Sequence, residues 1–501
     1  MMRRLLDLPL IVILMGLSAL AMLLPAAHAM ILRDYAVARG FFYSAFIVLV
    51  LVAMIAIASL NQRSRNAARG HLSALAGAYL VLPILLALPL TQLRLGISFG
   101  DAWFEMLSDF TTTGASVFDP ARLPPSVHLW RAFVGWLGGF FIILMAVAVL
   151  APMNLGGVEV VTGRAPGRGA VGTSQITRIA EPSERMLRYA TLIFPVYGGL
   201  TGLLWLALML AGDDSLVALC HAMSTLSTSG ISPLTGLQDS RSGVIGEVLI
   251  FGFLILALSR RFMPGASVVA QGMRRVDDPE LRLGLSMVAV VPVIFFAYHW
   301  VGAAPADTSH PFTALWGGAF LAISFLTTTG FDTGSSQIAM DWAGLRSPGL
   351  VLMGLAIVGG GVATTAGGVK LLRVYALIRH GEREVERLVH PNSVGGAGVA
   401  ARQMRREGAH VAWVFFMLFA LSIAFFTALL TFVGQSFETA LVFAIACLTT
   451  TGPLAGSLPD MAVSYADLGA AEQAVLGLAM VVGRLETLAI LALLAPDSWR
   501  R

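Results

Sequence analysis

Long hydrophobic runs follow one another along this chain, with few charged positions inside them. The runs at 8–24 and 40–60 are the first two. At a rise of about 1.5 Å per residue, each is long enough to cross a hydrocarbon core of about 30 Å. The pattern predicts an all-α polytopic membrane protein with about ten transmembrane helices. We expect these spans at 8–28, 40–60, 73–93, 127–152, 187–211, 244–265, 283–303, 347–375, 410–434 and 468–495.

Shorter, half-apolar segments follow the third, fifth, seventh and ninth of these spans. Each is too short to cross the membrane alone, and a half-length segment between two spans indicates a re-entrant helix and loop. The segments lie at 100–117, 213–232, 311–333 and 435–454.

Each half-length segment ends in a string of Thr and Ser that closes on glycine. The glycines are roughly 116, 100 and 122 residues apart, which predicts an internal repeat of span, half-helix, loop and span. A single string would be an ordinary helix C-terminus, where glycine is common, but recurrence in register favours a shared function. The strings are Thr111-Thr112-Thr113-Gly114, Ser227-Thr228-Ser229-Gly230, Thr327-Thr328-Thr329-Gly330 and Thr449-Thr450-Thr451-Gly452. The repeats are expected at 71–165, 166–275, 276–390 and 391–501, after two N-terminal helices at 1–70.

These loops have the chemistry that a dehydrated monovalent cation needs. Backbone carbonyls can replace the hydration shell of the ion if the chain is extended and they point inward. Glycine takes the required positive φ values without a Cβ penalty, and Thr and Ser hydroxyls can tie the loop to its surroundings. The half-helices would direct their partly negative C-terminal ends toward the ion. The sequence therefore predicts a pore that conducts monovalent cations.

Composition and charge fit a membrane protein. Hydrophobic residues make up 57% of the chain and charged residues 12%, against about 25% charged in soluble proteins. The net charge of +4 comes almost wholly from arginine, because Lys370 is the only lysine. Arginines recur in alternate loops, so the positive-inside rule places both termini in the cytoplasm. These loops carry Arg63, Arg65, Arg69, Arg164, Arg168, Arg178, Arg185, Arg260, Arg261, Arg274, Arg275, Arg379, Arg383, Arg387, Arg402, Arg405 and Arg406.

Three smaller features leave alternatives open. The first thirty or so residues imitate a signal peptide, but the charge topology favours an uncleaved first helix. Asp101, Glu105 and Asp109 form an acidic stripe, which predicts either a solvated or interface-facing helix side or an acidic mouth that concentrates cations. Cys220 and Cys447 indicate neither a disulfide framework nor a metal site, and packing is their expected role.

The pore strings resemble those of the Trk/Ktr/HKT superfamily of cation transporters, specifically its TrkH-type bacterial subunit. The resemblance covers essentially the whole chain. It is most specific at Phe104-Glu105, at Phe110 to Ala115, at His221-Ala222-Met223-Ser224-Thr225 and at Thr327 to Phe331. It implies that Gly114, Gly230, Gly330 and Gly452 are the selectivity-filter glycines. In the plant branch a serine at the first position accompanies sodium transport, so Gly114 implies potassium.

The eighth span contains a glycine-rich stretch at 359–370, with Gly359, Gly360, Gly361, Gly367 and Gly368 close to Lys370. Each glycine weakens a helix by roughly 1 kcal/mol relative to alanine. Irregular backbone at membrane depth is tolerated where it lines a path or is buried in protein, so we expect a broken helix below the filter. Small residues for close helix packing are the alternative. The resemblance implies a gating loop here, with Ala363 and Ala366 standing where glycines are expected.

Arg484 lies in the last span, with Glu486 close by. A charge inside a membrane helix usually faces a cavity or a partner. An ion pair with Glu486 or with an acidic residue elsewhere is one interpretation, although residues two apart on a helix do not face each other. The resemblance implies a pore-facing arginine beneath the filter, which acts as an electrostatic barrier and as part of the gate.

Other classes of function fit the sequence less well. An organic-solute carrier would show inverted or two-fold repeats, and the chain has neither HExxH nor GxSxG, so no enzyme activity is expected. A sodium or poorly selective monovalent cation transporter stays open. The chain has no P-loop or dinucleotide fingerprint, and we expect no cofactor. The resemblance implies a homodimer in the bacterial inner membrane with a cytosolic nucleotide-binding regulatory ring, for which the basic loop at 376–409 is a docking surface.

Overall fold

The structure is a computed structural model that describes residues 9–59, 67–93, 96–151, 182–262, 278–301, 311–343, 348–390, 408–457 and 463–486. Every regular element in these ranges is a helix, which confirms the predicted all-α class. Within the described residues, seven helices are long and apolar enough to cross a membrane. Most of the arginines that predicted the topology lie outside the described residues, as do both chain ends.

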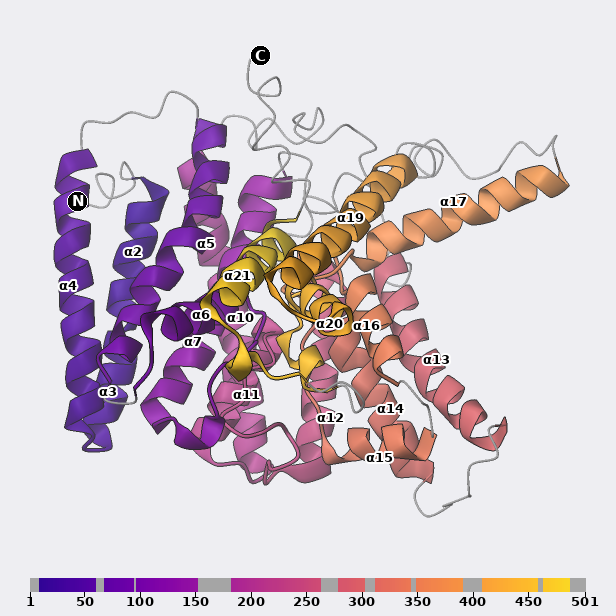
Figure 1. Ribbon diagram of the computed structural model, residues 1–501, viewed down its shortest axis with the longest axis horizontal. Coiled ribbons are helices and arrows are strands. Elements are labelled where there is room, and N and C mark those ends of the chain that lie inside the picture. The colour runs from indigo at the N-terminus through magenta and orange to yellow at the C-terminus, as the bar shows by residue number, and fades with distance from the viewer. Residues whose placement is uncertain are drawn as a thin grey trace.

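The N-terminal helices pack as a bundle against the first repeat (Figure 1). They are α2 (Leu10–Ala21), α3 (Leu23–Ile31) and α4 (Tyr35–Ser59). The contact centres on Trp130, which is fully buried, meets Phe41 of α4 edge-on at 5.7 Å and donates to the Leu86 carbonyl at 3.2 Å. A large aromatic side chain with its N–H satisfied is well suited to this role.

A long helix, a short helix and a second helix recur four times after this bundle. The first set is α5 (Ala67–Thr91), α6 (Phe99–Phe110) and α7 (Pro125–Met145). The second is α10 (Pro182–Leu210), α11 (Ser215–Ser227) and α12 (Gly243–Leu254), continued by the 3₁₀ turn η4 (Ile255–Leu258). The third is α13 (Pro279–Val301), α14 (Pro311–Leu326), α15 (Gly334–Ala343) and α16 (Pro348–Val358). The fourth is α19 (Ala409–Val433), α20 (Phe437–Leu448) and α21 (Ala470–Leu485).

Two of the ten expected spans are interrupted within the described residues, and a third is described only in part. The span expected at 244–265 changes from α12 into 3₁₀ turns after Leu254. The span expected at 347–375 is interrupted after Val358 and resumes as α17 (Leu371–Val389). The expected span at 468–495 is described only to residue 486. The repeat boundaries themselves stay predictions.

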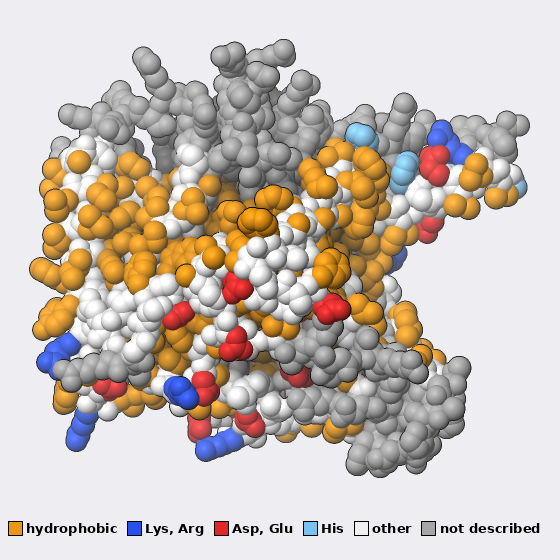
Figure 2. Space-filling model, in the orientation of Figure 1, with side chains coloured by type: hydrophobic (Ala, Val, Ile, Leu, Met, Phe, Trp, Pro, Cys, Tyr) orange, Lys and Arg blue, Asp and Glu red, His pale blue; other side chains and the backbone are white. Residues whose placement is uncertain are grey.

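The outer surface separates apolar and charged regions. In Figure 2 hydrophobic side chains cover the surfaces of α4, α5 and α19, whereas charged side chains gather in the lower half of the view and on the projecting helix at the upper right. On α4, Met54 and Ile57 are 65% and 71% exposed. Exposed apolar side chains over whole helices fit contact with lipid rather than water.

The helix α17 projects from the opposite side of the molecule from α4 (Figure 1). The sequence predicts a loop at 376–409, but α17 continues through Arg379 and Arg383 to Val389. Ion pairs at i and i+3 support it, such as Arg379 to Glu382 at 2.9 Å and Arg383 to Glu386 at 2.8 Å. This spacing places the paired side chains on one helix face, which is why the charged segment is helical.

Candidate functional site: four filter loops and a gate loop

All four short helices end in the same way. The chain turns left-handed at the second residue of each string, with φ of 57° at Thr112, 50° at Thr228, 58° at Thr328 and 56° at Thr450. The next N–H then bonds the carbonyl five residues back, as in Thr113 to Ser108 at 2.8 Å and Thr451 to Ala446 at 2.8 Å. This is the Schellman ending, in which glycine normally takes the left-handed position.

Threonine therefore occupies the position that a helix cap assigns to glycine, and the glycine follows two residues later. A β-branched residue in this conformation costs about 1–2 kcal/mol. An ordinary helix cap would place glycine in the strained position, so capping alone does not explain why threonine occupies it. The recurrence of the same strain in four places favours a functional constraint.

The hydroxyls of each string fall into two groups. The first and third hydroxyls bond each other, at 2.8 Å between Thr111 and Thr113 and at 3.0 Å between Thr327 and Thr329. We number the four strings in chain order as loops 1 to 4, so that they end at Gly114, Gly230, Gly330 and Gly452. The second hydroxyls of loops 1, 2 and 4 are buried without a hydrogen-bond partner; they belong to Thr112, Thr228 and Thr450. Buried hydroxyls nearly always have a partner. Unpartnered oxygens at equivalent places in different loops are suited to bind an ion.

The four loops meet one another through their glycines. A Cβ added at Gly114 would overlap the Ser229 carbonyl, and one at Gly230 would overlap the Thr329 carbonyl. Loop 4 closes the ring because the Gly452 N–H donates to the Thr113 carbonyl at 2.6 Å. The predicted filter residues of all four loops are thus brought together, and side chains at the glycine positions would push neighbouring carbonyls apart.

The acidic stripe on α6 divides in two, because Glu105 and Asp109 are fully buried while Asp101 is half-buried. The two buried carboxylates therefore lie on a helix side that faces another helix, not at a solvated outer mouth. Both face Arg131 of α7, which forms an ion pair with Glu105 and lies 3.7 Å from Asp109. Glu105 also accepts the Val117 N–H at 2.9 Å. A buried carboxylate needs such partners. The bond to Val117 also connects the segment after Gly114 to α6.

The glycine-rich stretch at 359–370 is irregular, as predicted, and we call it the gate loop. Its backbone groups bond several different elements, which excludes simple close packing of a continuous helix. The Gly361 N–H donates to the Ala257 carbonyl of η4 at 2.9 Å, and the Val362 N–H to the Glu280 carboxylate at 2.9 Å. Irregular backbone in a membrane protein requires such partners.

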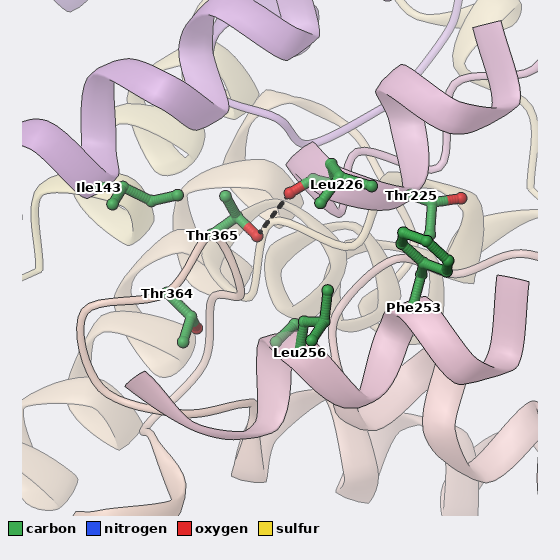
Figure 3. Close-up of a pocket in the computed structure, with 8 residues that line it drawn as sticks. Ile143, Thr225, Leu226, Phe253, Leu256, Thr364 and Thr365 are labelled. Atoms are coloured by element: carbon green, nitrogen blue, oxygen red, sulfur yellow. Dashed lines mark hydrogen bonds between the residues drawn. The ribbon is translucent and has the colours of Figure 1, made fainter. Parts of the chain in front are cut away.

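The gate loop lies directly against the filter loops. The Gly367 N–H donates to the Thr328 hydroxyl at 2.8 Å, so that, of the four second-position hydroxyls, the one in loop 3 has a hydrogen-bond partner. A Cβ on Gly367 would overlap the Thr449 carbonyl. Figure 3 shows Thr365 of the gate loop donating to the Leu226 carbonyl of α11, a bond of 3.3 Å beside a small pocket. A movement of the gate loop would therefore change contacts with loops 2, 3 and 4.

Arg484 of α21 bonds the backbone of the gate loop. Its guanidinium is 4% exposed and donates to the Thr365 carbonyl at 2.6 Å. Glu486 pairs with Arg373 at 2.6 Å rather than with Arg484, so the ion-pair interpretation of Arg484 and Glu486 is wrong. Lys370 also lies at this level, where its amino group bonds the Ala366 carbonyl. Two cationic side chains thus bond carbonyls of the gate loop: Arg484 from α21 and Lys370 from the end of the loop itself.

Two buried charged residues near the site escaped the sequence interpretation. Arg131 lies inside the span expected at 127–152, so the rule that identified Arg484 also applies to it. Glu280 lies just before the span expected at 283–303 and is 1% exposed. The sequence around Glu280 gives no sign that the side chain is buried. Glu280 accepts the Val362 N–H only because the fold brings the gate loop to α13.

Ala363 of the gate loop has φ of 55°, at a position where the family pattern suggests glycine. We expect Ala363→Gly to stabilise the protein by about 0.5–1 kcal/mol, because relief of left-handed strain exceeds the added entropy of the unfolded chain. Thermal unfolding in detergent measures the change. Ala376→Gly in α17 is the control and should destabilise by about 1 kcal/mol. A lower unfolding temperature for Ala363→Gly would contradict the strain argument.

The fold and site define a polytopic helical membrane protein with four converging pore-type loops above a broken helix. Among the described residues, no group of three or more His, Cys, Asp or Glu side chains could hold a metal ion. The chain matches the model of the TrkH family, described as cation transport protein, over residues 38–237 and 281–500. It belongs to this family.

Relatives match along nearly the whole chain. The Trk system potassium uptake protein TrkH of Vibrio parahaemolyticus is 28% identical over 493 residues, covering 97% of this chain and 98% of that protein. Its namesake from Escherichia coli K12 is 28% identical over 492 residues, covering 96% of each. The crystal structure of the potassium transporter TrkH from Vibrio parahaemolyticus matches with a TM-score of 0.78 and 27% identity, covering 100% of both chains.

Proposed function

We propose that this protein takes up potassium across the cytoplasmic membrane through a filter made by the four loops. The observation that carries the proposal is the set of buried, strained threonines whose hydroxyls are unpartnered in loops 1, 2 and 4. A ring of oxygens in fixed positions replaces the hydration shell of a monovalent cation. The full-length similarity to Trk system potassium uptake proteins supports potassium as the ion.

The proposed ion-binding residues are the second to fourth positions of each loop. They are Thr112, Thr113, Gly114, Thr228, Ser229, Gly230, Thr328, Thr329, Gly330, Thr450, Thr451 and Gly452. The gate loop with Lys370 and Arg484 controls passage below them. The protein acts without enzymatic chemistry and without a cofactor, and potassium is its substrate.

The proposed assembly is supported by the family resemblance and by α17. The protein is a homodimer in the bacterial inner membrane, with both termini in the cytoplasm, and a cytosolic nucleotide-binding ring regulates it. The helix α17 supports a docking role because it projects beyond the packed helices (Figure 1) and ends with Leu388 and Val389 84% and 65% exposed. Leucine and valine at a projecting end favour contact with another protein.

A poorly selective cation pathway is the second candidate function. The observation that favours it is the asymmetry of the ring, because Gly452 lacks the positive φ of the other three filter glycines. Fewer equivalent oxygens would discriminate less between sodium and potassium.

Purified protein in liposomes tests the proposal. We expect flux of potassium and rubidium to exceed flux of sodium and lithium, and expression should restore growth of a potassium-uptake-deficient bacterium at low potassium. Equal potassium and sodium flux would favour the second candidate. No cation flux, together with no growth despite membrane expression and a suitable partner, would overturn the proposal.

A further inference from the structure

Loop 4 differs from the other loops at its glycine. Gly114, Gly230 and Gly330 have φ of 72°, 68° and 73°. Gly452 instead begins a 3₁₀ turn, Gly452–Ala455, with Pro453 as its second residue. Because proline fixes its own φ and lacks an N–H, this turn cannot repeat the extended course of the other loops.

The carbonyl of Gly452 is already bonded to a side chain. It accepts the Tyr465 hydroxyl at 3.0 Å, and the tyrosine is 6% exposed. The Tyr465 ring packs against Phe443 of α20 at 4.9 Å and against Phe104 of α6 at 6.1 Å. Aromatic packing on two sides leaves the hydroxyl little freedom, so the Gly452 carbonyl stays committed to the protein.

The ring of Pro453 lies among the three other filter glycines. A Cβ built on Gly230 would come within 2.8 Å of Pro453 Cγ, and one on Gly330 within 3.1 Å of Pro453 Cβ. A Cβ on Gly114 would lie 3.6 Å from Pro453 Cδ. One side chain near three loops must lie toward the middle of their ring.

We propose that Pro453 is a specificity-determining residue that sets the size limit for ions at the glycine level of the filter. Its ring fills space that the glycines of loops 1, 2 and 3 leave open, where loop 4 would otherwise present a carbonyl. Tyr465 is a positioning residue, because its hydroxyl holds the Gly452 carbonyl and with it the start of the 3₁₀ turn. The inference rests on the proposed function, since it assigns a selectivity role within the same loops.

Flux of caesium relative to potassium tests this assignment in liposomes with the full chain. Pro453→Gly should raise the caesium-to-potassium flux ratio at least about threefold, because a wider opening admits the larger ion. Tyr465→Phe keeps the aromatic packing but removes the hydroxyl, and should shift the ratio in the same direction by a smaller factor. A merely structural loss would lower the flux of both ions and leave their ratio unchanged.

Tyr197→Phe is the matched control. Tyr197 is also buried and donates to a backbone carbonyl, that of Trp136 at 3.2 Å, so its removal should keep the wild-type ratio. If Pro453→Gly does not yield folded protein, Tyr465→Phe decides. An unchanged ratio in the folded variants would overturn the role of Pro453 while wild-type potassium flux persists. Absence of flux in the wild type would instead contradict the proposed function.

Discussion

Replacing Arg484 with alanine is expected to raise potassium flux about tenfold, which corresponds to a free-energy barrier to permeation about 1.4 kcal/mol lower. A fixed cationic group beneath the filter repels a passing cation. At an effective dielectric constant of about 20 and a separation of roughly 8 Å, two unit charges repel by about 2 kcal/mol. The bond from Arg484 to the Thr365 carbonyl at 2.6 Å also restrains the gate loop. Loss of the guanidinium removes both effects.

Two further variants separate charge from restraint. Arg484→Lys keeps the positive charge and should remain close to wild type if electrostatic repulsion dominates. Arg484→Gln removes the charge but keeps hydrogen-bond donors, and should conduct nearly as well as Arg484→Ala. The measurement is rubidium or potassium uptake into liposomes at equal protein content. Unchanged or reduced flux in Arg484→Ala would refute a barrier role for this residue.

The sequence predicts the repeated elements well because their signals are local. Half-length apolar segments between spans identify α6, α11, α14 and α20, and glycine density identifies the gate loop. Burial of Glu105 beside Arg131 depends on two helices that meet only in the fold. The sequence therefore leaves open whether the acidic stripe faces solvent, an interface or an outer mouth, since spacing along one helix does not reveal what packs against it.

In the filter, too, some features can be predicted from the local sequence and others depend on contacts between distant segments. The sequence suggests glycine as the residue with unusual backbone, whereas the structure also gives positive φ to the threonine two positions earlier. Propensity alone would not place a β-branched residue there. The special course of loop 4 begins with Pro453, but the contact that fixes the Gly452 carbonyl comes from Tyr465, thirteen residues further along the chain. Sequence similarity among the strings therefore suggests more symmetry than the loops have.

The second large effect is expected at Gly114. Gly114→Ala should lower the potassium-to-sodium flux ratio about tenfold and reduce potassium flux, since a correctly spaced ring of oxygens underlies selectivity. The added Cβ would overlap the Ser229 carbonyl of loop 2 and displace it. The left-handed backbone at Gly114, with φ of 72°, adds about 1–2 kcal/mol of strain to any residue with a Cβ.

Gly198→Ala in α10 is the control for this substitution. No atom lies within 4 Å of a Cβ built at Gly198, so the same chemical change meets neither a clash nor a filter oxygen. Gly114→Ser tests whether a hydroxyl has an effect on selectivity beyond that of the Cβ. Serine at this position accompanies sodium transport in the plant branch of the superfamily. If overlap with Ser229 is the cause, serine and alanine lower the ratio alike. A potassium-to-sodium ratio in Gly114→Ala equal to that of Gly198→Ala would remove loop 1 from the selectivity mechanism.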